Sequence, residues 1–262
     1  MQGKRRQGPV GYMTGKRVSK HCNITVEIIL NPKYSHLHDF LAHLEEHYQK
    51  GEIVQDDFNE IRILEVDGLK LSVKKYGQSM RHRLKFYKMA KGKKAYIGQR
   101  LLRERGYESP EPVAFVRYRR RMLTSRTYFV TVQSPLRHTL SDLPTLPQEE
   151  QKAVVRAFAA YAARFHEDGF IHRNLKTKHV LFDKMGDGYT FALLDANRVH
   201  KGRRVGVEKG CANFSRLDCS DENLKILLNE YADVRHADKA ACYNTFAQSH
   251  EKYRNKILRR GH

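Results

Sequence analysis

The sequence predicts an α+β fold of two lobes, a small lobe built on an antiparallel sheet and a large lobe that is mostly helical. Short β-branched runs are frequent in the first half of the chain, whereas apolar residues at helical spacing dominate the second half. A break at Ser134-Pro135 separates the two patterns. Because the sequence shows no internal repeat and no low-complexity linker, we expect both lobes to fold as one compact body.

Three segments are expected along the chain. Residues 1–22 are rich in Gly, Lys and Arg and carry little periodic apolar content, which is typical of a disordered basic tail. Residues 23–133 form the expected sheet lobe and residues 134–262 the expected helical lobe. The hinge between the lobes is therefore predicted near Gln133.

Five strands are predicted in the sheet lobe, at residues 23–30, 60–66, 69–74, 113–116 and 128–133. The second and third alternate in polarity around Asp67-Gly68, which is the signature of a two-residue β-hairpin. Residues 37–44 carry three leucines and a phenylalanine at helical spacing. A longer helix is predicted from Lys93 to Arg105, where Gly106 stops it.

Two long helical stretches are predicted in the second lobe. Between Glu149 and His166 one helical face is continuously apolar, and it is formed by Val154, Val155, Phe158, Ala159, Ala162 and Phe165. The stretch from Asp221 to Leu258 also carries its leucines in helical phase. Apolar faces of this length are typical of helices that pack on a core.

The chain carries a large positive charge. Its 262 residues include 49 Lys and Arg against 29 Asp and Glu, a formal net charge of +20. Such a surface attracts polyanions, and nucleic acid, an acidic membrane face and a phosphorylated glycolipid all fit it. The basic runs Lys91–Lys94, Arg117–Arg121 and Lys201–Arg204 fit solvated loops equally well, although Tyr118 could stack on a base. No signature of a nucleic-acid-binding module accompanies them, so no nucleic acid partner is expected.

Four cysteines, Cys22, Cys211, Cys219 and Cys242, form no CxxC pair and have no His at ligand spacing. This pattern indicates reduced thiols in a cytoplasmic protein. The basic N-terminus is not followed by an apolar segment of signal-peptide length, and no stretch approaches the ~18 apolar residues of a membrane span. Any membrane contact is therefore expected to be peripheral.

The segment from His166 to Phe182 resembles the catalytic loop of protein kinases. That loop carries His-Arg-Asp-Leu, whose Asp accepts the proton of the substrate hydroxyl, and a metal-binding Asn five residues after the Asp. Here His172 matches a packing residue that braces the loop, but Asn174 stands at the Asp position and His179 at the Asn position. Asn174 can hydrogen-bond to a hydroxyl but cannot take its proton at neutral pH, so general-base catalysis would be lost.

Further residues match the parts of a kinase that hold nucleotide and metal. An apolar strand ends at Asp195, where kinases keep the aspartate that binds magnesium, and His179 is a second candidate ligand although magnesium prefers oxygen. Ser72 and Lys74 share strand parity and would face the nucleotide, with Lys74 on the α- and β-phosphates. The glycine-rich loop is nearly absent, and the helix that follows offers no carboxylate before Glu104 to pair with the lysine.

Five blocks outside this loop resemble the lipopolysaccharide core kinases of Gram-negative bacteria, which phosphorylate Kdo or heptose sugars on a protein-kinase-like fold. The blocks are Leu30–Tyr34, Phe58–Ile61, Leu101–Ala114, Leu193–Arg198 and Lys209–Leu217. The resemblance covers roughly residues 23–256. Its last two blocks are considerably more specific than the catalytic loop.

The resemblance implies ATP and Mg²⁺ as cofactors, with Lys74 on the ATP phosphates and Asp195 on the magnesium. It implies the lipopolysaccharide inner core or a lipid A-Kdo glycolipid as partner, at the anionic inner face of the inner membrane. Asn174 departs from the family pattern, while a His at position 179 is similar to the heptose-kinase branch and unlike the Asn of the Kdo branch.

Two functions are therefore weighed. One is an ATP-dependent sugar kinase with a degraded catalytic loop. The other is an inactive pseudokinase that binds nucleotide or glycolipid without transfer. A nucleic-acid binder is a third and weaker reading. For the first two, Lys74 and Asp195 are predicted to converge on one interlobe cleft with Asn174 beside them.

Overall fold

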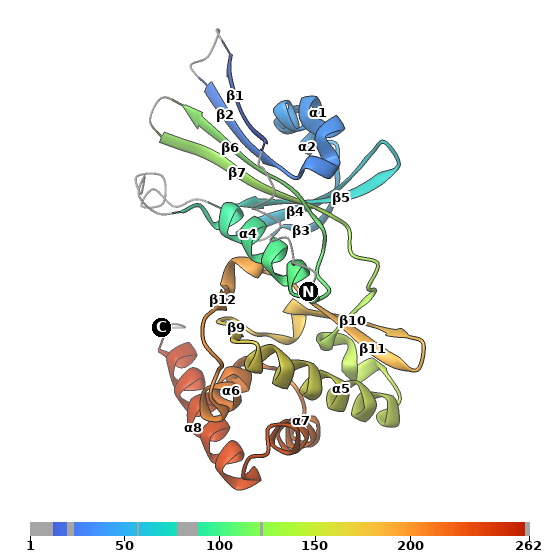
Figure 1. The fold of residues 1–262 in the computed structure, drawn as a ribbon, viewed down its shortest axis with the longest axis vertical. Coiled ribbons are helices and arrows are strands. Elements are labelled where there is room, and N and C mark those ends of the chain that lie inside the picture. The colour runs from blue at the N-terminus through green and yellow to red at the C-terminus, as the bar shows by residue number, and fades with distance from the viewer. Residues whose placement is uncertain (1–12, 20–23, 57, 78–88, 121–122, 260–262) are drawn as a thin grey trace, which may run out of the picture. The chain divides into compact units, whose positions relative to one another are not determined.

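The computed structural model describes residues 13–19, 24–56, 58–77, 89–120 and 123–259. The chain divides into two compact units, a sheet unit of residues 1–100 and 110–133 and a helical unit of residues 101–109 and 134–262. Figure 1 shows the antiparallel sheet of the first unit and the helices of the second. The predicted fold class, α+β with a small antiparallel-sheet lobe and a mostly helical lobe, is confirmed.

The described residues of the sheet unit form a seven-stranded antiparallel sheet in the order β1-β2-β6-β7-β5-β4-β3. Its strands are β1 (Met13–Ser19), β2 (Ile24–Leu30), β3 (Glu52–Asp56), β4 (Asn59–Val66), β5 (Leu69–Tyr76), β6 (Pro112–Arg120) and β7 (Leu123–Val132). The predicted hairpin joins β4 to β5, where Asp67 and Gly68 both have positive φ, 50° and 74°. Two consecutive left-handed residues match the right-handed twist of the flanking strands.

Each face of this sheet packs on a different set of helices (Figure 1). One face covers η1 (Pro32–Leu37), α1 (His38–Ala42) and α2 (Leu44–Tyr48), and the other face packs on α4 (Lys91–Glu104). Strand alternation decides which side chains go where. Leu71 and Val73 of β5 are fully buried on the α1–α2 side. Ser72 and Lys74 therefore lie on the α4 side.

The first predicted segment needs a correction. We expected disorder through residue 22, but Met13–Ser19 forms β1 and pairs antiparallel with β2 over its whole length. Backbone N–H and C=O groups make this pairing, so a basic composition does not prevent it. β1 is also an edge strand of the sheet, where charged residues are common because they discourage pairing with a further strand.

The described residues of the basic run Arg117–Arg121 lie in a strand and not in a loop, since β6 continues to Arg120. Tyr118 is buried, with 5% of its surface exposed, and its ring packs edge-on against Tyr128. The interpretation of Tyr118 as a base-stacking platform is therefore wrong. Arg117 forms an ion pair with Glu27 on the adjacent strand β2, so part of this charge is neutralised locally.

The helical unit contains α5 (Gln148–Glu167), α6 (Val207–Asn213), α7 (Asp221–Val234) and α8 (Lys239–Leu258). Between them run the short strands β8 (His138–Thr139), β9 (Phe170–His172), β10 (Val180–Met185), β11 (Gly188–Leu193) and β12 (Val199–Lys201). Single 3₁₀ turns are η2 (Leu140–Thr145), η3 (Thr177–His179), η4 (Ala196–Arg198) and η5 (Phe214–Arg216). All six predicted core positions of α5 are buried.

The end of α4 and the state of the cysteines agree with what the sequence predicts. α4 ends at Glu104 and Gly106 has φ 75°, which confirms the predicted stop. Cys211, Cys219 and Cys242 are free thiols, and Cys22 lies outside the described residues. Among the described helices none combines the length and the apolar character that a membrane crossing requires.

Candidate active site

Backbone pairing in the helical unit brings the catalytic-loop residues and the end of β11 together. β10 pairs with β11, and Leu194 N–H donates to the carbonyl of His179 at 2.8 Å. The Nε2 of His172 lies 3.1 Å from the carbonyl of the same Leu194. Asp195 is the next residue. Hydrogen bonds to the backbone of Leu194 therefore hold His172 and His179 next to Asp195 in the chain.

Asp195 has an unusual backbone conformation. Its φ of 56° and ψ of 41° place it in the left-handed region, which only two other non-glycine residues of the described chain enter. Such a conformation costs free energy and is often kept where a side chain must point in a defined direction. The Asp195 side chain is 16% exposed, and Arg198 lies 3.9 Å from its carboxylate.

His172 is fully buried at the end of β9. A carbonyl can only accept, so Nε2 carries the proton in its bond to Leu194, and Nδ1 holds the lone pair. Burial, and to a smaller extent the neighbouring His179, lower the pKa of His172 to about 4, so the ring is neutral at pH 7. This environment suits a residue that braces the loop rather than one that exchanges protons.

Arg216, which sequence reasoning missed, holds the side chain of Asn174. Its Nη1 donates to Asn174 Oδ1 at 3.0 Å and to the carbonyl of Arg173 at 3.2 Å. Because the guanidinium can only donate, the amide oxygen of Asn174 must face Arg216, and Nδ2 remains to donate elsewhere. Arg216 lies in the block Lys209–Leu217 that carries the family resemblance, and this was the available signal.

A directional chain of hydrogen bonds supports the loop from behind. Arg235 donates to the hydroxyl of Tyr231 at 2.8 Å, and that hydroxyl lies 2.9 Å from Nδ1 of His166. His166 Nε2 is 3.2 Å from Asn213 Oδ1, and Asn213 Nδ2 donates to the carbonyl of His172 at 3.0 Å. Arg235 can only donate and Asn213 Oδ1 can only accept. The Tyr231 hydroxyl therefore accepts from Arg235 and donates to His166 Nδ1, and His166 Nε2 donates to Asn213.

This chain requires neutral His166, because Nδ1 must accept a hydrogen bond. Burial lowers the pKa of His166 to about 4. Gly210 of α6 packs against the same bond: a Cβ there would lie 1.9 Å from the Tyr231 hydroxyl oxygen and 2.9 Å from His166 Nδ1. Gly210, in the block Lys209–Leu217, therefore leaves the space that the hydrogen bond between Tyr231 and His166 requires.

The candidate metal ligands fit a divalent cation in part. His179 Nδ1 donates to the carbonyl of Asn174 at 2.9 Å, so in the neutral ring the lone pair is on Nε2. Metal-ligating histidines are commonly oriented by this kind of bond to a backbone carbonyl. The described residues contain no cluster of three or more His, Cys, Asp or Glu side chains. A metal held by Asp195 and His179 would therefore take its other ligands from phosphate and water.

Ser72 and Lys74 belong to the sheet unit. Lys74 Nζ lies 5.4 Å from the ring centre of Tyr76, which is buried against Ala95 and Tyr96 of α4. The convergence of Lys74 with Asp195 stays a prediction, because the two residues belong to different units.

The α4 positions packed against the sheet carry no acid. Ala95, Tyr96 and Gln99 are buried there, and Gln99 is a neutral amide where a kinase helix would offer a carboxylate.

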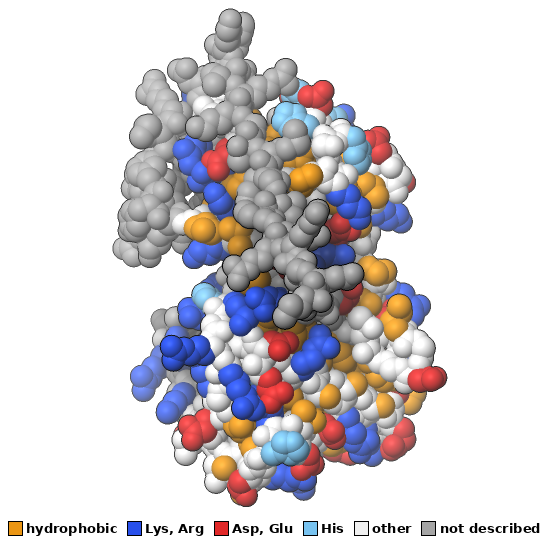
Figure 2. All heavy atoms as spheres, in the orientation of Figure 1, with side chains coloured by type: hydrophobic (Ala, Val, Ile, Leu, Met, Phe, Trp, Pro, Cys, Tyr) orange, Lys and Arg blue, Asp and Glu red, His pale blue; other side chains and the backbone are white. Residues whose placement is uncertain are grey.

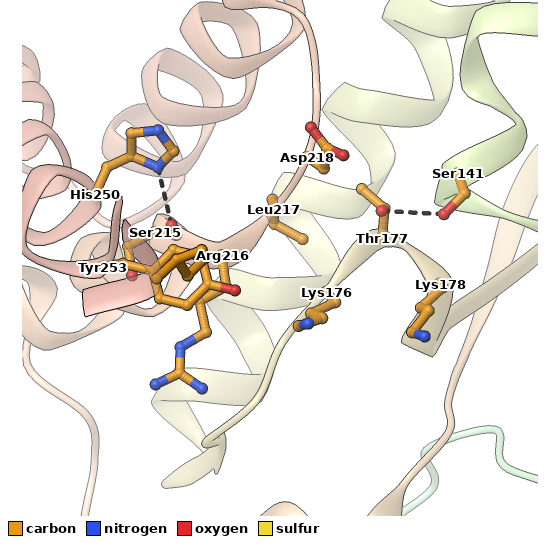
Figure 3. Close-up of a pocket in the computed structure, with 11 residues that line it drawn as sticks. Ser141, Lys176, Thr177, Lys178, Ser215, Arg216, Leu217, Asp218, His250 and Tyr253 are labelled. Atoms are coloured by element: carbon orange, nitrogen blue, oxygen red, sulfur yellow. Dashed lines mark hydrogen bonds between the residues drawn. The ribbon is translucent and has the colours of Figure 1, made fainter. Parts of the chain in front are cut away.

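A pocket of about 420 Å³ opens beside the catalytic loop within the helical unit (Figure 3). Its walls come from η3, from η5 and the two residues after it, and from the second half of α8. The Ser141 hydroxyl bonds to Thr177 at 3.0 Å, and His250 donates to the carbonyl of Ser215 at 2.9 Å, which closes two sides of the pocket. Sequence reasoning missed this pocket, because α8 lies some seventy residues beyond the loop.

Comparison with known proteins identifies the family of this chain. Residues 89–239, more than half of the chain, match the model of the lipopolysaccharide kinase (Kdo/WaaP) family. The chain belongs to this family. Among curated proteins no match is found. Membership implies a nucleotide, ATP, as the phosphoryl donor.

One similar solved structure is described as WaaP in complex with acyl carrier protein. It is 17% identical, the alignment covers 86% of this chain and 98% of that chain, and the TM-score is 0.60. At this identity the likeness supports the kinase-like fold.

Proposed function

We propose that this protein transfers the γ-phosphoryl group of ATP to a hydroxyl of a Kdo or heptose sugar in the lipopolysaccharide inner core. The observation that carries the proposal is the hydrogen-bonded cluster of His172, Asn174, His179 and Leu194, directly followed by Asp195, in a chain of the lipopolysaccharide kinase family. Phosphoryl transfer depends mainly on positioning and electrostatic stabilisation, and this cluster is built to position.

Each candidate residue has a role in this proposal. Asp195 and His179 would hold Mg²⁺, and Lys74 and Ser72 would contact the phosphates. Magnesium supplies neutralisation of the charge on the β- and γ-phosphate oxygens. The left-handed backbone of Asp195 directs its carboxylate, and the bond from His179 Nδ1 to the Asn174 carbonyl fixes the orientation of the His179 ring.

Asn174 would orient the acceptor hydroxyl without removing its proton. Its Oδ1 is held by Arg216, so the amide can donate from Nδ2 to the hydroxyl oxygen. Loss of a general base typically lowers a rate by about 10²–10⁴-fold. We therefore expect a slow kinase, in which positioning and metal charge provide most of the acceleration.

A pseudokinase that binds nucleotide or glycolipid without transfer is the second candidate. Two observations favour it: the amide at position 174 is fixed by a cation, and the buried face of α4 is neutral at Gln99. Kinases use a carboxylate of that helix to orient the phosphate-binding lysine, whereas the amide of Gln99 carries no charge.

The proposed acceptor is a glycolipid, so we also propose that the protein acts at an anionic membrane surface of the cytoplasmic side. On the face shown in Figure 2, Lys and Arg side chains of the helical unit are interspersed with acidic ones. With a net charge of +20, binding to anionic vesicles should weaken sharply as salt shortens the Debye length below about 8 Å. Cosedimentation that does not change with salt would contradict this part of the proposal.

The function is tested by two measurements on the full chain. Nucleotide binding is measured with and without Mg²⁺, and phosphate transfer from ATP is measured on purified inner-core acceptor. We expect Mg²⁺-dependent binding and slow transfer, both impaired in Asp195→Ala. Binding of ATP with no transfer above the Asp195→Ala blank would favour the pseudokinase, and absence of any ATP binding would exclude both nucleotide-dependent readings.

A further inference from the structure

The pocket beside the catalytic loop has a strongly uneven charge. Lys176, Lys178 and Arg216 line it, and Asp218 is its only acidic residue. In Figure 3 the three cationic groups lie toward one side of the pocket, and Asp218 lies at the other. Within the described part of the chain, none of the three cations forms an ion pair with a carboxylate. Lys176 and Arg216 are also partly buried, which makes uncompensated charge costly.

Arg216 is held ready to bind an oxyanion. Its Nη1 is engaged by the catalytic loop, and its guanidinium carbon lies 5.1 Å from the ring centre of Tyr253. This contact with the ring and the bonds of Nη1 restrict the movement of the guanidinium. Nε and Nη2 form no hydrogen bond to the described residues, and together they match the two oxygens of a carboxylate or phosphate.

Neutral polar groups complete the wall around these cations. His250 uses Nδ1 to bind the carbonyl of Ser215, so its Nε2 remains for a ligand hydroxyl. Tyr253 and Ser141 bring further hydroxyl groups. A volume of about 420 Å³ is within the range of small-molecule sites, and this mixture of hydroxyl, imidazole and cation suits a charged sugar.

From these observations we infer that the pocket binds an anionic substituent, phosphate or carboxylate, of the acceptor sugar. The inference rests on the proposed function and adds the site and the charge of the acceptor group. The location argues for acceptor over nucleotide, because Arg216 bonds directly to Asn174 while Lys74, Ser72 and Asp195 do not line the pocket. One guanidinium thus links the anion to the residue that would orient the reacting hydroxyl.

Binding is tested first without nucleotide, on the full chain, with three simple probes. Glucose 6-phosphate and glucuronate carry the two candidate anions, and glucose carries none. We expect calorimetric binding of at least one anionic probe, and about ten-fold weaker binding in Arg216→Gln and in Lys178→Gln, since a hydrogen bond to a charged group is worth roughly that factor. The stronger probe identifies the anion.

Arg203→Gln is the matched control, since Arg203 is an exposed cation of the same unit that lines a different surface pocket. Its affinity for the probes should equal that of the wild type. Thermal melts of every variant exclude loss of folding as the cause. Equal binding of glucose and the anions, or equal weakening in Arg203→Gln and Lys178→Gln, would overturn the inference.

Acceptor kinetics separate this inference from the proposed function. Lys178→Gln should raise KM for the glycolipid acceptor about ten-fold and leave kcat nearly unchanged, as expected for a contact that is equally strong in ground and transition states. Transfer with an unchanged KM in Lys178→Gln would overturn the pocket and leave the kinase proposal standing. Anion binding that is lost in Lys178→Gln, in a protein that transfers no phosphate, would support the pocket and contradict the kinase proposal.

Discussion

The two units position their candidate residues by different means. In the sheet unit, Ser72 and Lys74 are placed by the alternation of β5, whose register with β4 and β7 is made by backbone hydrogen bonds. In the helical unit, the loop around Asn174 is held by His166 at the end of α5 and by side chains of α6, α7 and Arg216, which are some forty or more residues away in sequence. The first arrangement tolerates substitution of neighbouring side chains, whereas the second depends on each member of a polar chain.

The sharpest test of this comparison uses two aspartates with the same backbone strain. Asp195→Ala should lower phosphate transfer by about 10³-fold, because a metal ion contributes several kcal/mol of charge stabilisation. Asp67→Ala removes a left-handed aspartate from the exposed β4–β5 turn and should cost stability alone. Steady-state transfer rates and melting temperatures are compared. Equal loss of activity in both variants would show that the transfer rate depends on the strained backbone and not on the Asp195 carboxylate.

Asn174→Asp should raise transfer by less than the about 10²–10⁴-fold that a general base provides. Arg216 would pair with the new carboxylate, lower its pKa and weaken it as a base. The double variant Asn174→Asp with Arg216→Gln frees the carboxylate, and a cycle of the four proteins measures the coupling. A wild type that already matches Asn174→Asp would show that the amide is no impediment.

The helical unit should also be the one that acid destabilises. The pKa of His166 and of His172 is about 4 in the folded protein against 6.5 for an ordinary His. The unfolded chain therefore binds more protons between these values. The stabilisation is fully present above pH 6.5 and is lost as the pH falls from 6.5 toward 4, by up to about 3 kcal/mol for each histidine.

Denaturant midpoints measured from pH 7 to pH 4 test this expectation. Amide hydrogen exchange of the folded protein, corrected for the intrinsic rates at each pH, locates the first region to open. Protection should be lost around α6 and α7 before the β4–β5 hairpin, since the described part of the sheet unit has no buried His. His36→Asn, on an exposed sheet-unit histidine, should keep the wild-type profile. A profile that is flat down to pH 4 would contradict the neutral, buried state of both rings.

The smallest expected effect concerns packing around the polar chain. Gly210→Ala should cost about 1–3 kcal/mol, because the added methyl group meets the Tyr231 hydroxyl and forces its bond to His166 to lengthen. Gly188→Ala adds the same methyl group in open space on β11 and should change stability by less than about 0.5 kcal/mol. Urea titrations of both variants provide the comparison. An unchanged stability of Gly210→Ala would show that Tyr231 and His166 can shift and keep their hydrogen bond.

Local patterns were sufficient to predict much of this protein. Alternation predicted the β4–β5 hairpin and the shared face of Ser72 and Lys74, and helical spacing predicted the buried face of α5, because both depend on nearest-neighbour geometry. The catalytic-loop segment indicated a kinase family, which the family match confirms. The roles of Asn174, His179 and Asp195 stay predictions, although the structure gathers these residues in one unit.

Tertiary packing decided what lies beyond those patterns. Pairing with β2 turned the basic segment Met13–Ser19 into a strand, and burial against Tyr128 removed Tyr118 from the surface. The bond from Arg216 to Asn174 and the cationic pocket closed by α8 join residues that are forty or more positions apart. Such contacts have no local period, because they depend on where whole helices and loops pack, and only the folded chain brings their partners together.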